Sequence, residues 1–204
     1  MAPADGRSTV SFRHAFEHRD ALLATALRAF VAHGYEGTSL SAVLTEAGVS
    51  KGQFYHHFDG KEGLYVGVCE ALVDRKRAHF AAHPPPTADD PFDALEAALR
   101  AGLAFARAHP DLDAFGRAFL RERGRPIFDH VLRTLPVAID DGLRSALERG
   151  VAQGAFDPGY APGFAARAIA AVVGTAGDLF DADDPERGVA DLMRFLRRGL
   201  AAKG

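Results

Sequence analysis

The chain has 204 residues, of which 48% are hydrophobic and 25% charged, and its 24 Lys and Arg against 27 Asp and Glu give a net charge of −3. This composition is typical of a globular protein and excludes a wholly disordered chain. No stretch approaches about 18 apolar residues without a charge, so we expect no transmembrane helix. The one cysteine, Cys69, excludes an internal disulfide, and no apolar signal segment follows Met1. We therefore expect a cytoplasmic protein with a buried, unreactive thiol.

The N-terminal part of the chain predicts an irregular segment followed by a helix. Residues 1–18 are polar and weakly periodic, and we predict a flexible arm there. From Arg19 onward, apolar residues recur every three or four positions, which is the period of an α-helix with one buried face. Gly34 follows the last periodic residue, so we expect the helix to end there.

Three further helical segments are predicted next. Thr38 is the predicted N-cap of a helix over residues 40–47, which a glycine ends. Ser50 is the predicted N-cap of a helix that runs to about residue 57, and another helix begins near Lys61. Two short helices joined by a Gly-containing turn form a helix-turn-helix, a unit that lays its second helix in the major groove of DNA.

The remainder of the chain is predicted to be helical after one break. Residues 83–91 contain four prolines and cannot form the interior of a helix. Helical periods then follow over residues 92–108, 110–122, 126–151 (with an interruption at Pro136), 162–180 and 185–202. Because no β pattern longer than a few residues occurs, the sequence predicts an all-α protein of about nine helices.

The outer face of the predicted helix after Ser50 is rich in hydrogen-bond donors. It carries Lys51, Gly52, Gln53, Tyr55, His56 and His57, whereas Phe54 and Phe58 are expected to face inward. Tyr, His and Lys side chains can donate to phosphate oxygens, and the Gln53 amide offers a donor and an acceptor suited to adenine N6 and N7. Thr38 and Lys61 lie at helix starts, where free N–H groups favour phosphates.

These residues lie in the runs Gly34-Tyr-Glu-Gly-Thr-Ser-Leu40 and Ala47-Gly-Val-Ser-Lys-Gly-Gln-Phe-Tyr-His-His-Phe58-Asp-Gly-Lys-Glu-Gly-Leu64. Both runs resemble the DNA-binding domain of the TetR family of bacterial transcriptional regulators, over about residues 19–68. The resemblance implies a homodimer with an N-terminal three-helix helix-turn-helix domain over residues 19–64. It also implies a C-terminal helical domain for ligand binding and dimerisation over residues 65–204.

The resemblance also assigns roles to individual residues. It implies phosphate contacts from Thr38, Tyr55, His57 and Lys61, and base contacts from the start of the recognition helix, Lys51, Gly52 and Gln53. The full predicted DNA-binding set is Thr38, Ser39, Ser50, Lys51, Gly52, Gln53, Tyr55, His56, His57 and Lys61. The predicted partner is double-stranded operator DNA.

The family's C-terminal domain supplies two further expectations. The last two helices, about 162–180 and 185–202, are expected to form the homodimer interface, with a seam of Leu192, Leu196 and Leu200. The middle helices are expected to enclose a cavity for a small, largely apolar inducer. The candidate lining residues are Phe105, His109, Phe115, Phe119, Phe128 and Phe156.

Together these features predict a homodimeric repressor that a small apolar ligand releases from its operator. One alternative is a DNA-binding regulator without a small-molecule inducer. Another is a helical metalloenzyme, because His14 and His18 with Glu17 match an H-x-x-E-H zinc pattern. Against this enzyme, the motif lies in a polar arm, and no third ligand, P-loop or nucleophile elbow is visible. We therefore expect no enzyme, no cofactor, no metal and no membrane partner.

Overall fold

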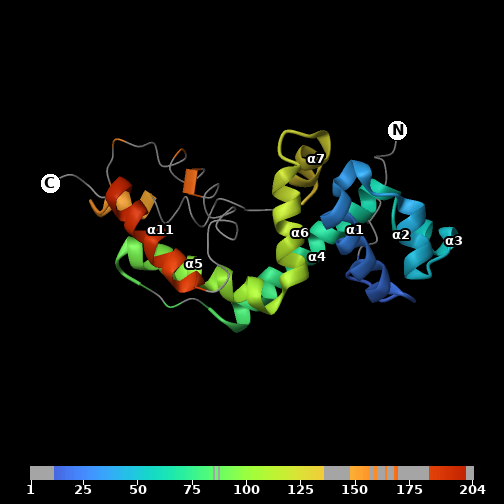
Figure 1. Ribbon diagram of the computed structural model, residues 1–204, viewed down its shortest axis with the longest axis horizontal. Helices are drawn as coiled ribbons and strands as arrows, with labels where there is room; N and C mark the ends of the chain where they lie inside the picture. Colours follow the sequence, from blue (N-terminus) through green and yellow to red (C-terminus); the bar gives the residue numbers. More distant parts are fainter. Residues whose placement is uncertain are drawn as a thin grey trace, which may run out of the picture. The chain divides into compact units, whose positions relative to one another are not determined.

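The computed structural model describes residues 12–84, 86, 88–135, 148–156, 159, 164, 168–169 and 184–200. The fold is all-α, as predicted (Figure 1). The helices are α1 (Arg19–Gly37), α2 (Leu40–Ala47), α3 (Lys51–His57), α4 (Lys61–Ala82), α5 (Pro91–Ala108), α6 (Pro110–Arg121), α7 (Pro126–Thr134) and α11 (Pro185–Leu200). The predicted helix over 162–180 falls largely outside the described residues. Within those residues, no helix is long and apolar enough to span a membrane.

The chain forms two compact units, each built from two separate stretches of sequence. The first unit comprises Met1–Ala78 and His109–Val137, and the second comprises His79–Ala108 and Ala138–Gly204. The first unit joins α6 to the helix-turn-helix, because α6 packs against α1. This division by packing differs from the predicted boundary after residue 64. The functional division into DNA-binding and ligand-binding parts stays a prediction.

Glycine and serine residues define the corners of the helix-turn-helix. Gly34 interrupts α1 with φ of 66°, and Gly48 ends α2 with φ of 68°, both left-handed conformations that favour glycine. The predicted cap of α2 was wrong by one residue: the Ser39 hydroxyl, not that of Thr38, accepts a hydrogen bond from Ala42 N at 3.4 Å. Thr38 instead donates to Gly34 O at 2.7 Å.

An aromatic cluster forms the core of the first unit. The Tyr65 ring on α4 lies 4.8 Å from Phe30 of α1 and 5.5 Å from Phe115 of α6, centroid to centroid. Burial raises the pKa of the Tyr65 hydroxyl and of the Cys69 thiol. Cys69 is therefore the buried, unreactive thiol that the sequence predicts.

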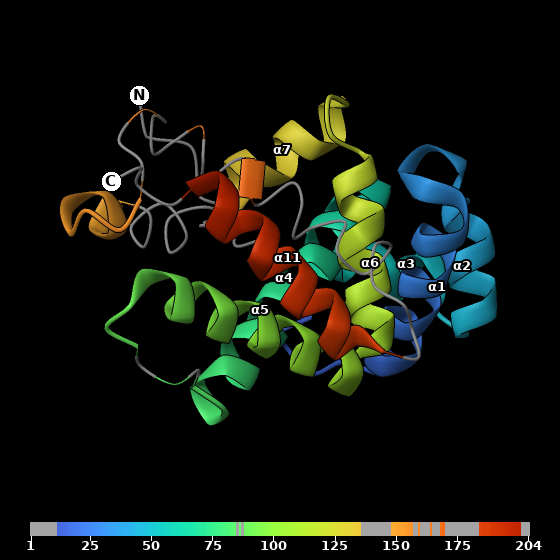
Figure 2. The same cartoon turned by 60° about the vertical axis from the view of Figure 1, so that its left-hand side comes forward.

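The core of the second unit lies between α5 and α11, which run side by side (Figure 2). It comprises Phe92, Leu95, Leu99, Phe156, Ile169, Val189, Leu192, Met193 and Leu196. The predicted dimer seam is therefore corrected: Leu192 and Leu196 are buried within their own chain. Their helical spacing places both on the face of α11 that α5 covers, and periodicity alone does not distinguish burial within a chain from burial between chains.

Candidate nucleic-acid interface

Helix α3 is short, capped and held from below by aromatic side chains. Ser50 and Gln53 form a capping box, in which the Ser50 hydroxyl accepts from Gln53 N at 3.2 Å and Gln53 Oε1 accepts from Ser50 N at 3.1 Å. Phe54 and Phe58 are buried, with ring centroids 5.5 Å apart. Because these two rings fix the inner face, the opposite face of α3 points away from the core.

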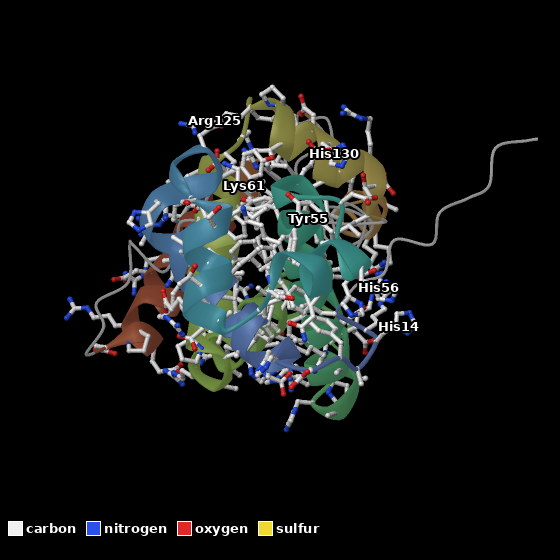
Figure 3. All side chains as sticks on the ribbon, turned by 90° about the vertical axis from the view of Figure 1, so that its right-hand side faces the viewer. His14, Tyr55, His56, Lys61, Arg125 and His130 are labelled. Atoms are coloured by element: carbon white, nitrogen blue, oxygen red, sulfur yellow. The ribbon has the colours of Figure 1, made fainter. Side chains whose placement is uncertain are left out.

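The outer face of α3 carries most of the predicted contact residues. Tyr55 is 60% exposed, and Lys51, Gly52, Gln53 and His56 are exposed too. A Cβ built on Gly52 meets no atom within 4 Å, so the space above this position is open to a partner. Figure 3 shows Tyr55, His56 and Lys61 on one face of the first unit. The structure therefore brings these donors together on one exposed surface.

Lys61 is fixed at the corner between α1 and α2. Its ammonium group donates to Glu36 O at 3.1 Å and Thr38 O at 3.2 Å, and it lies 4.6 Å from the centre of the Tyr35 ring. An ammonium group has three N–H donors, so two backbone contacts leave one for a phosphate oxygen. The sequence placed Lys61 at a helix start, but this cross-link to the preceding corner depends on the tertiary structure.

Two of the predicted phosphate-contacting residues, Thr38 and His57, are more buried than the sequence suggests. Thr38 is only 3% exposed, and its hydroxyl is used inside the α1–α2 corner. His57 is half-buried, and its ring stacks on Phe16 with centroids 4.2 Å apart. The His57 Nδ1 atom is buried without a hydrogen-bond partner in the described part of the chain. Burial, with nearby His56 and His14, lowers the His57 pKa and thereby favours the neutral imidazole.

Residues 12–18, predicted as part of a flexible arm, pack against α3 and α4. Phe12 is buried, and its ring centroid lies 4.9 Å from that of Phe58. Glu17 accepts a hydrogen bond from Gln53 Nε2 at 3.3 Å. Sequence reasoning missed Glu17 as a neighbour of the recognition helix. Phe12 and Phe16 were the available signal, because two large apolar rings in an otherwise polar segment favour its docking on the core.

The six predicted ligand residues are divided between the two units. In the first unit, Phe115, Phe119 and Phe128 are buried, and the last two rings stack at 4.7 Å. In the second unit, Phe105 packs beside Phe80, and the ring centroids of Phe156 and Phe92 lie 4.7 Å apart. His109 belongs to the first unit, where it directly precedes α6. Each of these phenylalanines is a core side chain here. The sequence could not distinguish this role from a place in a cavity wall, because aromatic residues in both roles are apolar and face inward. A ligand role for them stays a prediction.

The zinc pattern of the arm does not gather a ligand set. In the part of the chain with described coordinates, no group of three or more His, Cys, Asp or Glu side chains could hold a metal ion. His18 Nε2 lies 3.5 Å from Glu17 Oε1, which is an ion-pair geometry. The His14/His18 metal site therefore gains no support from the described structure.

An all-α fold with a capped helix-turn-helix, whose second helix exposes donors above an aromatic core, defines a helix-turn-helix protein. Residues 22–68 match the family described as bacterial regulatory proteins, tetR family. The chain is 32% identical over 135 residues to the HTH-type transcriptional regulator RutR of Escherichia coli, covering 65% of this chain and 60% of that protein. Residues 22–68 thus form a domain of the TetR family, which confirms the resemblance seen in this part of the sequence.

Other relatives match over different lengths. The uncharacterized HTH-type transcriptional regulator YerO of Bacillus subtilis is 37% identical over 57 residues, which are 28% of this chain and 20% of that protein. The chain thus spans between a fifth and three fifths of these two curated relatives. Among solved structures, a TetR family transcriptional regulator from Chloroflexus aurantiacus has the same fold, with a TM-score of 0.74 and 22% identity over 94% of this chain and 97% of that chain. A putative regulator from Shewanella sp. PV-4 gives a TM-score of 0.75 at 24% identity, over 92% of this chain and 100% of that chain.

Proposed function

We propose that the protein is a homodimeric transcriptional repressor that binds operator DNA through α3 and is released by a small, largely apolar ligand. The observation that carries this proposal is the outer face of α3, where exposed Gly52, Gln53 and Tyr55 lie above buried Phe54 and Phe58. The relatives' names support it, since they are HTH-type transcriptional regulators, and the repressor ComR of Escherichia coli is 39% identical over 64 residues, covering 31% of this chain and 30% of that protein. We propose further that it acts in the cytoplasm, where operator DNA would be its partner, and that like the relatives named as regulators it is not an enzyme.

The proposed DNA contacts are of two kinds. Tyr55 and Lys61 offer donors to phosphate oxygens, which position the protein without reading sequence. Lys51, Gly52 and Gln53 at the start of α3 are the proposed base-contacting residues, because the N-terminal residues of a recognition helix reach base edges. Thr38 supports this surface from inside, since its carbonyl oxygen holds the Lys61 ammonium group.

A hydrogen bond from α1 to the end of α6 supports a route for ligand control. Glu122, buried just after α6, accepts from Tyr35 N at 2.9 Å through Oε1, and its Oε2 lies 3.1 Å from Arg125 Nη1. Tyr35 in turn lies beneath the Lys61 ammonium group. A ligand that binds preferentially to a state with displaced α6 would therefore move the corner that holds Lys61. It would lower DNA affinity only as far as its own affinity differs between the two states.

Two exposed phenylalanines support the proposed dimer. Phe164 is 57% exposed and Phe195 on α11 is 68% exposed, and each belongs to one of the two predicted dimer segments. Large exposed apolar side chains mark interaction surfaces when they cluster. We propose that the face of α11 that carries Phe195, rather than the Leu192 face buried against α5, meets the second subunit.

Replacement of Tyr55 by Phe tests the phosphate role. The variant loses one hydroxyl donor and nothing from the core, so we expect about a five-fold weaker affinity on every duplex, corresponding to one lost hydrogen bond of about 1 kcal/mol. Fluorescence anisotropy at fixed salt, on a selected operator and on random duplexes, measures this change. A loss restricted to the operator would contradict the phosphate role, and a wild-type chain that binds no duplex at low salt would contradict the proposed function.

A further inference from the structure

The segment of residues 12–18, here called the clasp, is fastened to the recognition helix at several points. Phe12 lies against Phe58, and a Cβ built on Gly67 of α4 would come within 3.3 Å of the Phe12 ring, so the ring packs directly on the α4 backbone. Arg13 donates two hydrogen bonds to Asp74, at 2.7 and 2.9 Å, and pairs with Glu70 at 2.9 Å. These contacts anchor the clasp on α4.

The second half of the clasp reaches α3. Phe16 stacks on His57 with an interplanar angle of 19°, and Arg19 Nε donates to Phe12 O at 2.5 Å, which holds the clasp backbone against the start of α1. Figure 3 shows His14 of the clasp and His56 of α3 on the same side of the first unit. The Phe16 ring before Glu17 and the Arg19 hydrogen bond after it therefore hold the Glu17 carboxylate beside α3.

The Gln53 amide is already engaged at both ends. Its Oε1 accepts from Ser50 N in the capping box, and its Nε2 donates to Glu17 Oε2. A free glutamine would present one donor and one acceptor to adenine. Here the capping box occupies one of the two lone pairs of Oε1 and orients the amide, and one Nε2 hydrogen remains. The Glu17 side chain is 74% exposed, so its carboxylate is the available acceptor next to Gln53.

We propose that Glu17 is a specificity-determining residue of the DNA-binding face, and that Glu17 and Gln53 together read an exocyclic amino group in the major groove. This inference rests on the proposed function and names the chemistry that α3 recognises. Carboxylate oxygens accept from cytosine N4 or adenine N6, whereas they repel the keto oxygens O6 of guanine and O4 of thymine at the same place. The pair therefore favours a base with an amino group over a base with a keto group.

Two competing accounts of Glu17 make different predictions. If its charge acts only by repelling phosphates, removing the charge strengthens binding to all duplexes equally, since phosphates carry no sequence information. If Glu17 reads a base, its removal changes preference at one base pair, and that base pair is the one affected by Gln53. Because Glu17 is exposed, its substitution leaves the core intact.

The experiment compares wild type, Glu17→Gln, Gln53→Ala, the double variant and Asp59→Asn. Asp59 is a matched control, because it is an exposed carboxylate just beyond the other end of α3. Selection from a randomised duplex library with the full chain gives the operator. Anisotropy at fixed salt then gives the affinity for that operator and for each of its single-base variants.

We expect wild type to prefer cytosine or adenine at one position by about ten-fold over guanine or thymine, within the range of a single good base contact. Glu17→Gln should reduce this ratio to about two-fold, the double variant should equal Gln53→Ala, and Asp59→Asn should retain the ratio. An unchanged ratio in Glu17→Gln, with binding merely stronger everywhere, would overturn the inference while leaving the proposed function intact. A library from which wild type enriches no sequence would overturn both.

Discussion

The contact between Gly34 and Glu122 gives a prediction in which two glycines provide the comparison. Gly34 and Gly48 both have positive φ, of 66° and 68°, but ψ is −178° at Gly34 and 24° at Gly48. A Cβ added at Gly34 would lie 2.9 Å from Glu122 Oε1, whereas a Cβ at Gly48 would meet nothing within 4 Å. The two alanine variants therefore differ in backbone strain as well as in this contact, and the cost of displacing Glu122 is measured by repeating Gly34→Ala in a Glu122 variant.

The magnitudes follow from these geometries. Gly48→Ala carries the left-handed backbone penalty alone, about 1–2 kcal/mol. Gly34→Ala places an alanine in a φ/ψ region nearly restricted to glycine, at about 1–3 kcal/mol. It also displaces the buried carboxylate from Tyr35 N, and losing a hydrogen bond to a charged group costs about 1.5–3 kcal/mol. We expect Gly34→Ala to lower the free energy of unfolding by about 3–4 kcal/mol. The reduced entropy of the unfolded chain is the same for both variants and cancels in the comparison.

Urea denaturation followed by circular dichroism measures both values. Glu122→Gln is a third variant, because it retains a side-chain oxygen that can accept from Tyr35 N. In that background the extra cost of Gly34→Ala should fall, since the displaced group is no longer charged. An equal cost of Gly34→Ala in wild type and in the Glu122→Gln background would refute the contact between Glu122 and the α1 kink, and with it the proposed route of ligand control.

Two other regions of the protein give further predictions. Burial lowers the pKa of His57 in the folded protein, so the unfolded chain takes up the proton more readily, and stability should decrease as pH falls below the ordinary histidine value of about 6.5. The free energy of unfolding, measured between pH 5 and 8, should depend less steeply on pH in His57→Gln than in wild type. His33→Gln, which replaces an exposed histidine on α1, is the control, and equal slopes in wild type and His57→Gln would contradict this prediction. Leu192→Ala should lower the free energy of unfolding by about 2–5 kcal/mol, because the side chain is buried against α5. Phe195→Ala should alter it by less than about 0.5 kcal/mol but weaken self-association in sedimentation velocity, and an unchanged dimer would count against the proposed face of α11.

Local patterns were sufficient to predict most of the helix-turn-helix. The apolar period, the serine at the start of α3 and the glycines at 34 and 48 act over one or two turns, so their effect is readable from neighbouring residues. The buried rings of Phe54 and Phe58 follow from the same period. Local reasoning could not choose between adjacent residues for the N-cap of α2, since Thr38 and Ser39 are both good caps. Only the tertiary structure decides, because the Thr38 hydroxyl bonds to the end of α1 and leaves Ser39 as the cap.

Residues far apart in sequence account for what was missed. Glu17 and Gln53 are 36 positions apart, and Tyr35 and Glu122 are 87 apart, so no local period connects them. The same limit explains the aromatic residues proposed for a ligand cavity, because Phe115 and Phe119 have the helical spacing of core residues whatever lies opposite them.

The order of the described helices, the turns at Gly34 and Gly48 and the polar outer face of α3 were determined by the sequence alone, because these features depend on propensity and periodicity within a few residues. The tertiary structure alone decided that residues 12–18 lie against α3 and that Lys61 is tied to the preceding corner. It also decided that Leu192 faces α5. Such pairings depend on which surfaces meet when the chain folds, and hydrophobicity, being non-directional, does not specify the partner.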